Sequence, residues 1–171
     1  LVIGAAVDVL EDIVNIDGGS YDKAGVDAVG ARLRKFLGEQ GIACETIANE
    51  TFGDALRATV GGPSNSAIML MGHRDTVFPK GEPTRRPFKI ENGKAYGPGV
   101  ADMKAGLVMN AFVLAAFQKF GGAPAPLVGL FTSDEEIGSP TSRALIETEG
   151  RKAKYVLVTE PAREGGKIVT G

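Results

Sequence analysis

The sequence has little of what a disulfide-rich, redox or nucleic-acid-binding protein needs. Its 171 residues include one cysteine, one histidine and no tryptophan, and 19 basic residues nearly balance 21 acidic ones. Cys44 cannot form an internal disulfide and is not part of a CxxC pair, so we expect a buried small hydrophobic residue there. Because no basic block is present, we expect no nucleic-acid partner.

The first 16 residues are apolar but do not have the pattern of a signal peptide or a membrane span. Acidic residues interrupt this segment, it is too short to cross a bilayer, and no basic region precedes it. We expect an amphipathic helix, no membrane partner and a cytoplasmic protein. Position 1 is not methionine, so the N-terminus looks trimmed. Export of the protein therefore remains an alternative to a cytoplasmic location. The last residues, "KIVTG", look like a strand that has been cut.

Helix-like and strand-like segments alternate along the chain. The pattern predicts a three-layer α/β sandwich, in which helices flank a mainly parallel sheet with mixed edges. "ENGK" at 91–94 predicts a hairpin turn. Helices are predicted at 1–16, 23–39, 103–122 and 140–150, and strands at 42–48, 67–71, 127–131, 155–159 and 167–170.

The polar residues that need an explanation follow the predicted strands. In an open α/β sheet, ligands bind in the crevice outside the carboxyl ends of the strands. Three consecutive carboxylates in "TSDEEIGS" would repel one another there unless a divalent cation sat among them. The residues expected to converge are His73, Asp75, Asp102, Asp134, Glu135, Glu136 and Glu160.

The types of side chain indicate which cation fits. One imidazole with several carboxylates and no thiolate suits zinc, with cobalt or manganese as alternatives, better than calcium. His73 and Asp75 are two positions apart, so in extended backbone they point to the same face. Asp75 could then accept the second ring N–H of His73 and fix its tautomer, which makes it a candidate catalytic residue.

Four motifs, "MGHRDTV", "YGPGVADMKAG", "TSDEEIGS" and "TEPA", occur in this order over nearly the whole chain. Together they resemble the zinc-dependent co-catalytic metallopeptidases that include glutamate carboxypeptidases, aminoacylases and succinyl-diaminopimelate desuccinylases. "DTVFPKG" and "GKAYGPG" are most similar to the glutamate carboxypeptidase branch. Ala105 stands where the family often has glycine, a small departure that a helix absorbs.

The resemblance implies a site with two zinc ions. His73 and Glu160 would bind one zinc, Glu136 would bind the other, and Asp102 would bridge both. Glu135 would be the general base that moves the proton of the attacking water. The resemblance also implies a cis peptide bond between Asp102 and Met103.

The family needs a further histidine for its second zinc, beyond a smaller lid domain. We therefore expect residues 1–171 to be the N-terminal portion of the catalytic domain and to be inactive alone. The lid, through which the family can form a homodimer, and the rest of the catalytic domain would lie outside this chain. The implied function is metal-dependent amide hydrolysis, which releases a C-terminal amino acid such as glutamate from a small peptide or N-acyl amino acid.

Several alternatives stay open at the level of the sequence. The chain could be a truncated or regulatory relative that binds one metal or none and does not catalyse. Asp134 could be a solvated acid at a helix start, and Asp102 could cap its helix. A serine hydrolase is disfavoured because Ser133 is not in a GxSxG elbow. A glycosidase using Glu135 and Glu160 would leave the histidine unexplained.

Overall fold

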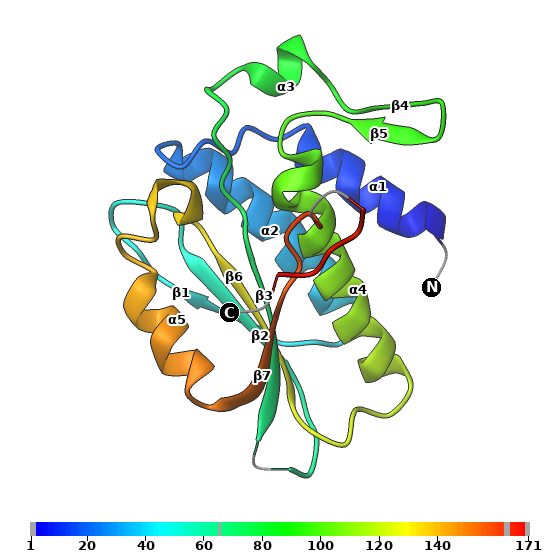
Figure 1. The fold of residues 1–171 in the computed structure, drawn as a ribbon, viewed down its shortest axis with the longest axis vertical. Helices are drawn as coiled ribbons and strands as arrows, with labels where there is room; N and C mark the ends of the chain where they lie inside the picture. The colour runs from blue at the N-terminus through cyan, green and yellow to red at the C-terminus, as the bar shows by residue number, and fades with distance from the viewer. Residues whose placement is uncertain (1–2, 65, 163–164, 170–171) are drawn as a thin grey trace.

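The computed structural model describes residues 3–64, 66–162 and 165–169 (Figure 1). Its main sheet has five strands in the order β1-β2-β6-β3-β7. β3 pairs in parallel with β6 and with β7, whereas β2 pairs antiparallel with β6 and β1 pairs antiparallel with β2. The predicted mixed sheet is therefore confirmed. The strands are β1 (Cys44–Ile47), β2 (Ala55–Val60), β3 (Ala67–His73), β6 (Leu127–Thr132) and β7 (Ala153–Val158).

Helices cover both sides of the sheet, as predicted for a three-layer sandwich. α1 (Ile3–Val14), α2 (Lys23–Glu39) and α4 (Ala105–Lys119) lie on one side, and α5 (Arg143–Gly150) lies on the other (Figure 1). The main core fills the space between the three helices and strands β2, β3 and β6. Its fully buried members include Ile13, Val29, Leu33, Leu37, Leu107, Leu114 and Phe131.

The sequence missed one strand, β2, and predicted one strand, at 167–170, that the described residues do not form. β2 was not predicted, although Arg57 and Thr59 alternate with three buried apolar residues, Leu56, Ala58 and Val60, which is the period of a half-buried strand. The predicted strand at 167–170 does not form in the described part of that segment. Ile168 and Val169 are 87% and 72% exposed, so no packing partner holds them in a sheet. Thr170 lies outside the described residues.

All four predicted helices are present, but most of their ends differ from the prediction. α2 begins where Asp22 accepts a hydrogen bond from the Gly25 N–H, which caps the helix. α1 ends at Val14 rather than at position 16, and positions 1 and 2 of that prediction lie outside the described residues. α5 begins at Arg143 rather than at position 140. α4 begins at Ala105 rather than at position 103, because Asp102 and Met103 have non-helical dihedral angles in the wide turn Val100–Lys104.

α4 and the turn before it are long and apolar enough to cross a bilayer by composition. In the structure this helix packs against β2, β3 and β6, and seven of its residues are buried. Its apolar character is thus that of a core helix. Cys44, expected to be buried, is only half-buried at the margin of the core because β1 is the outermost strand.

A hairpin extends away from the main sheet, as "ENGK" predicts (Figure 1). β4 (Lys89–Glu91) pairs antiparallel with β5 (Lys94–Tyr96). Asn92 and Gly93 both have positive φ angles, 51° and 73°, which a tight hairpin turn of this twist requires. A single-turn helix that was not predicted, α3 (Glu82–Arg85), precedes the hairpin, and Glu82 pairs there with Arg85 and Arg86.

Candidate metal centre

The three parallel strands end at one edge of the sheet, and the residues that follow them meet there. His73 is the last residue of β3 and is 2% exposed. Glu135 and Glu136 lie in the short turn after β6, and Glu160 follows β7 by two positions. Asp102 reaches the same place from the turn before α4. The structure thus brings together His73 with the carboxylates of Asp102, Glu135, Glu136 and Glu160, whose individual roles remain predictions. Asp134 was expected there too, but its side chain bonds to Thr141 and Ser142 instead.

One nitrogen of the His73 ring faces a group of carboxylates. The distance from His73 Nε2 is 3.2 Å to Asp102 Oδ1, 3.3 Å to Glu160 Oε1 and 3.6 Å to Glu135 Oε2. Glu136 joins this group, since one ligand atom each from His73, Asp102 and Glu136 lie within 4.8 Å of one another. An imidazole and several carboxylates therefore converge on one small volume.

The other ring nitrogen faces Asp75. His73 Nδ1 is 3.0 Å from the Asp75 backbone oxygen and 3.3 Å from Asp75 Oδ1. When Nδ1 donates its hydrogen to Asp75, the lone pair of Nε2 points at the carboxylate group and is available to a metal. Asp75 lies beyond the end of β3, so the contact depends on the turn as well as on the predicted alternation of side chains.

Asp75 also anchors the turn that carries Glu135 and Glu136. Its fully buried carboxylate accepts hydrogen bonds from Ser20 Oγ at 2.7 Å and from the Glu135 and Glu136 N–H groups at 3.1 Å each. Burial alone would raise the pKa of Asp75, but the hydrogen bonds from His73 and Ser20 outweigh it and lower the pKa. The carboxylate stays ionised and fixes the ring and the turn together.

The sequence did not point to Ser20. It lies in "DGGSYD", a loop with no pattern that marks a hydrogen bond to a residue 55 positions away. The backbone donors of Glu135 and Glu136 were missed for the same reason, because a peptide N–H leaves no signature in the sequence.

Asp134 corrects the expectation of a solvated acid. Its side chain is fully buried and accepts hydrogen bonds from the Thr141 N–H and Oγ1, both at 2.7 Å, and from the Ser142 N–H at 3.1 Å and Oγ. These bonds satisfy a buried charge and close the loop from 134 to 142. Asp134 thus holds the loop, while Glu135 and Glu136 point toward His73.

The cis peptide bond expected between Asp102 and Met103 is present. Met103 is buried, and its Sδ accepts a hydrogen bond from the His73 N–H at 3.2 Å. The Asp102 side chain is 58% exposed and makes no capping bond to α4, whose N-cap is Lys104. The helix-cap alternative for Asp102 is therefore not supported.

The charges of the carboxylates around His73 favour a bound cation at this place. Burial by itself would lower the pKa of His73, but the hydrogen bond to Asp75 and the charges of Asp75, Glu160 and Glu135 raise it to about 9. Burial raises the pKa of Glu136 and of Glu160, and the neighbouring Asp102 charge raises both further. A proton on His73 balances the carboxylates in the metal-free protein. A divalent ion could take its place, and the nitrogen and oxygen donors fit zinc, cobalt or manganese.

Comparisons with known proteins identify the family of this chain. The family model described as "Peptidase family M20/M25/M40" matches residues 69–171. Carboxypeptidase G2 of Pseudomonas sp. (strain RS-16) is 37% identical over 164 residues, which are 94% of this chain and 40% of that protein. Succinyl-diaminopimelate desuccinylase of Legionella pneumophila (strain Lens) is 29% identical over 165 residues, or 90% of this chain and 42% of that protein. The chain spans about two fifths of these curated relatives.

Solved structures share the fold. Human carnosine dipeptidase 1 matches with a TM-score of 0.78 at 18% identity, over 94% of this chain and 39% of that one. The M20 family metallo-carboxypeptidase Sso-CP2 from Sulfolobus solfataricus matches with a TM-score of 0.77 at 18% identity, over 95% of this chain and 39% of that one. The matched family model covers more than half of the 171 residues, and the resemblance read from the four motifs is confirmed: the chain belongs to the peptidase family M20/M25/M40.

Proposed function

We propose that the protein carrying this chain is a zinc-dependent exopeptidase or amidohydrolase. It hydrolyses an amide bond and releases a C-terminal amino acid, glutamate by preference, from a small peptide or N-acyl amino acid. The observation that carries this proposal is the approach of three carboxylates to within 3.2–3.6 Å of His73 Nε2, at the edge where parallel strands end. The preference for glutamate rests on the resemblance of "DTVFPKG" and "GKAYGPG" to the glutamate carboxypeptidase branch.

Four side chains would hold the metal: His73, Glu160 and Glu136 as terminal ligands and Asp102 as a bridge. Bound zinc would supply the Lewis acidity that polarises the scissile carbonyl and acidifies water. Asp75 keeps Nδ1 of His73 protonated and the ring oriented. The hydrogen bonds that the Glu135 and Glu136 N–H groups donate to the Asp75 carboxylate hold the turn beside this ring.

Glu135 would move the proton. Its carboxylate is 46% exposed, so it can reach a water molecule and a substrate, and its Oε2 lies 3.6 Å from His73 Nε2. In the proposed reaction it takes a proton from the attacking water and delivers it to the departing amine. A positioned carboxylate in this role contributes about 10²–10⁴ in rate.

A second zinc would need one more ligand than these residues provide. We propose that a histidine, a lid domain through which the protein dimerises and the remainder of the catalytic domain are contributed by sequence beyond this chain, in a cytoplasmic protein. The similarity to relatives more than twice as long supports this proposal.

The decisive experiment measures metal content and turnover on the same sample. The natural full-length protein is dialysed, its zinc is counted by elemental analysis against its intact mass, and release of glutamate from N-acyl glutamates is followed. Two zinc ions and hydrolysis are expected. A protein that retains no metal and cleaves no amide would contradict the proposal and favour the non-catalytic alternative.

A further inference from the structure

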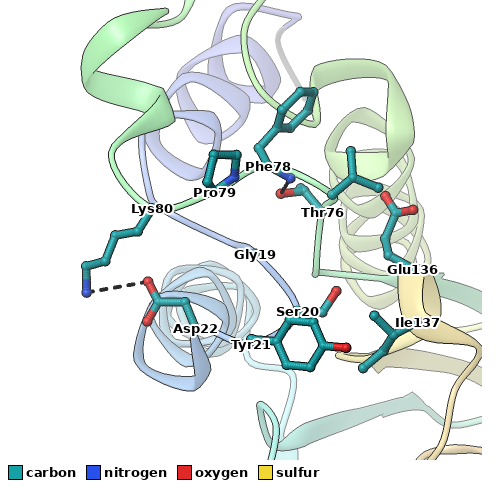
Figure 2. Close-up of a pocket in the computed structure, with 11 residues that line it drawn as sticks. Gly19, Ser20, Tyr21, Asp22, Thr76, Phe78, Pro79, Lys80, Glu136 and Ile137 are labelled. Atoms are coloured by element: carbon teal, nitrogen blue, oxygen red, sulfur yellow. Dashed lines mark hydrogen bonds and ion pairs between the residues drawn. The ribbon is translucent and has the colours of Figure 1, made fainter.

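Two pockets of similar volume differ in the charges that line them. The first is about 590 Å³ and lies beside the candidate metal centre, between the loop 19–22, the segment 76–80 and the turn that carries Glu136. Figure 2 shows Lys80, the one cation among its described lining residues, pointing to Asp22, and Lys80 Nζ lies 3.6 Å from Asp22 Oδ2. Asp22 and Glu136 together leave this pocket with a surplus of negative charge.

The second pocket, which we call the hairpin pocket, has a volume of about 570 Å³ and the opposite charge. It lies between the end of α3, the hairpin and the turn that begins at Val100. Among the described residues, its lining includes Arg85, Arg86 and Lys89 but no carboxylate. It shares no lining residue with the first pocket and contains none of the candidate metal ligands, so it is a separate site.

The segment that forms the hairpin pocket is the basic part of the chain. Residues 80–94 contain five basic and two acidic side chains, out of 19 basic and 21 acidic ones in total, so the rest of the chain has 14 basic and 19 acidic residues. The surface around the hairpin is thus positive in a protein whose net charge is −2. A concave surface lined by charges of one sign concentrates ions of the opposite sign, which are anions here.

A buried carboxylate holds two arginines of this pocket in place. Glu82 is 5% exposed and accepts hydrogen bonds from Arg85 Nε at 2.9 Å, from Arg85 Nη2 at 2.6 Å and from Arg86 Nε. The hydrogen bonds from Arg85 lower the pKa of Glu82, so this carboxylate stays ionised. Two guanidinium groups share one negative charge, which leaves one positive charge in surplus. Both side chains are at least half exposed, so their other N–H groups are accessible to a ligand.

Aromatic rings orient two of the three cations. Arg86 Cζ lies 4.9 Å from the centre of the Phe78 ring, and Lys89 Nζ lies 5.3 Å from the centre of the Tyr96 ring. Lys89 also pairs with Glu91 at 3.0 Å, but both side chains are more than half exposed, and ion pairs of this kind contribute little. A bound anion can therefore replace Glu91 as the partner of Lys89.

The donors of this pocket match a phosphate group. The planar fork of a guanidinium fits phosphate oxygens, and hydrogen bonds between charged groups are roughly twice as strong as those between neutral ones. A volume of about 570 Å³ is that of a site for a small organic molecule and not for an ion alone. Pro87, Tyr96 and Val100 give the pocket an apolar surface against which an organic group can pack.

We propose that the hairpin pocket binds a small organic phosphate monoester, with its phosphate on Arg85 and Arg86 and its organic group against Tyr96. This site is distinct from the candidate metal centre, and the inference does not depend on the proposed amide hydrolysis.

The test titrates phenyl phosphate and inorganic phosphate into the natural full-length protein with its metal, by isothermal titration calorimetry at neutral pH. Phenyl phosphate should bind about 10-fold more tightly than inorganic phosphate, because its ring buries apolar surface. Arg85→Gln and Arg86→Gln should each weaken the binding of phenyl phosphate about 10-fold. Arg86→Lys keeps the charge but not the fork and should recover only part of the loss. Arg151→Gln, at an exposed position after α5, is the matched control and should not change the affinity.

A bound metal also attracts phosphate, so the titrations are repeated after the metal has been removed with EDTA and dialysis. Binding that persists without the metal and is weakened by the two arginine variants is the expected result. Binding that disappears with the metal, or that neither arginine variant changes, would overturn the proposal, as would no binding of either compound at millimolar concentration. Release of glutamate is measured separately, so none of these outcomes decides whether the protein is a hydrolase.

Discussion

Ser20 donates its hydroxyl hydrogen to the carboxylate of Asp75 across 2.7 Å, although 55 positions separate them in the sequence. The bond links the loop that lines the pocket beside the metal centre to the residue that orients His73. Asp75 also accepts the main-chain N–H groups of Glu135 and Glu136. One buried carboxylate therefore aligns three parts of the site: the histidine, the acidic turn and the pocket wall.

Ser20→Ala should weaken the site without unfolding the protein. Asp75 would lose one of its hydrogen-bond donors. Loss of a residue that supports a metal ligand in this way typically lowers metal affinity or activity about 10- to 100-fold. Zinc affinity by competition with a chelator and kcat/KM are the measurements. Ser20→Thr keeps the hydroxyl and should recover most of the loss, whereas Ser64→Ala, at an exposed position, should change neither quantity. An unchanged zinc affinity in Ser20→Ala would show that Asp75 needs no support from this loop.

Glu135→Gln should abolish turnover and leave the metal in place. Glutamine cannot take a proton from water, so kcat should fall by about 10²–10⁴ or more. Elemental analysis should still find nearly the full zinc content. Activity retained in this variant would remove Glu135 as the base.

Asp102→Ala should lose metal, because Asp102 is the proposed bridge and its Oδ1 lies 3.2 Å from His73 Nε2. Zinc per protein after dialysis is the readout. Asp8→Ala removes the same charge from an exposed position of α1 and serves as the matched control. Equal zinc content in the two variants would argue against a bridging carboxylate.

Gly106→Ala should disturb both stability and the site. A Cβ atom at Gly106 would lie 2.2 Å from the Thr159 carbonyl oxygen, so the end of β7 and the adjacent Glu160 would have to move. Overpacking of this kind costs about 1–3 kcal/mol. Gly38→Ala in α2, where the new Cβ meets nothing within 4 Å, should instead gain up to about 1 kcal/mol. Thermal unfolding and zinc affinity of the two variants test this contrast, and equal stability would refute it.

The stability of the metal-free protein should depend on pH in a specific way. The pKa of His73 is raised from 6.5 to about 9, so its stabilisation is complete below pH 6.5 and is lost as the pH rises through 9. Burial lowers the pKa of Lys104 from 10.5 to about 8, which adds stability as the pH rises above 8. The free energy of unfolding in EDTA should therefore fall from pH 6.5 to 8 and level off between pH 8 and about 9.

Denaturant unfolding at each pH measures this profile. His73→Asn should remove the fall between pH 6.5 and 8, because it removes the group whose pKa is raised across that range. Saturating zinc should also remove it, since a metal replaces the proton on the ring. A fall of equal size in His73→Asn would place its origin elsewhere.

The sequence predicts the parallel strands and the convergence of the site because both depend on short-range patterns. "AIMLM", "LVGLF" and "YVLVT" are continuous apolar runs, and residues after such strands meet at one edge. β2 was missed because the polar residues Arg57 and Thr59 interrupt "ALRATV", so it is not a continuous apolar run like the other three. The roles of Ser20 and Asp134 could not be predicted, because their hydrogen bonds depend on how loops return to the sheet.

The order of the strands has a consequence for how the chain reaches this fold. β3 lies between β6 and β7, and both of its neighbours follow it in the sequence. During synthesis from the N-terminus, the apolar segment "AIMLM" must wait until residues 127–132 have been made before it can pair with either neighbour. Contacts of such long sequence separation form slowly. A ribosome-bound chain that ends before β6 therefore exposes β3, an interior strand of the finished sheet, to chaperones, and it cannot yet assemble the ligands that a metal would need.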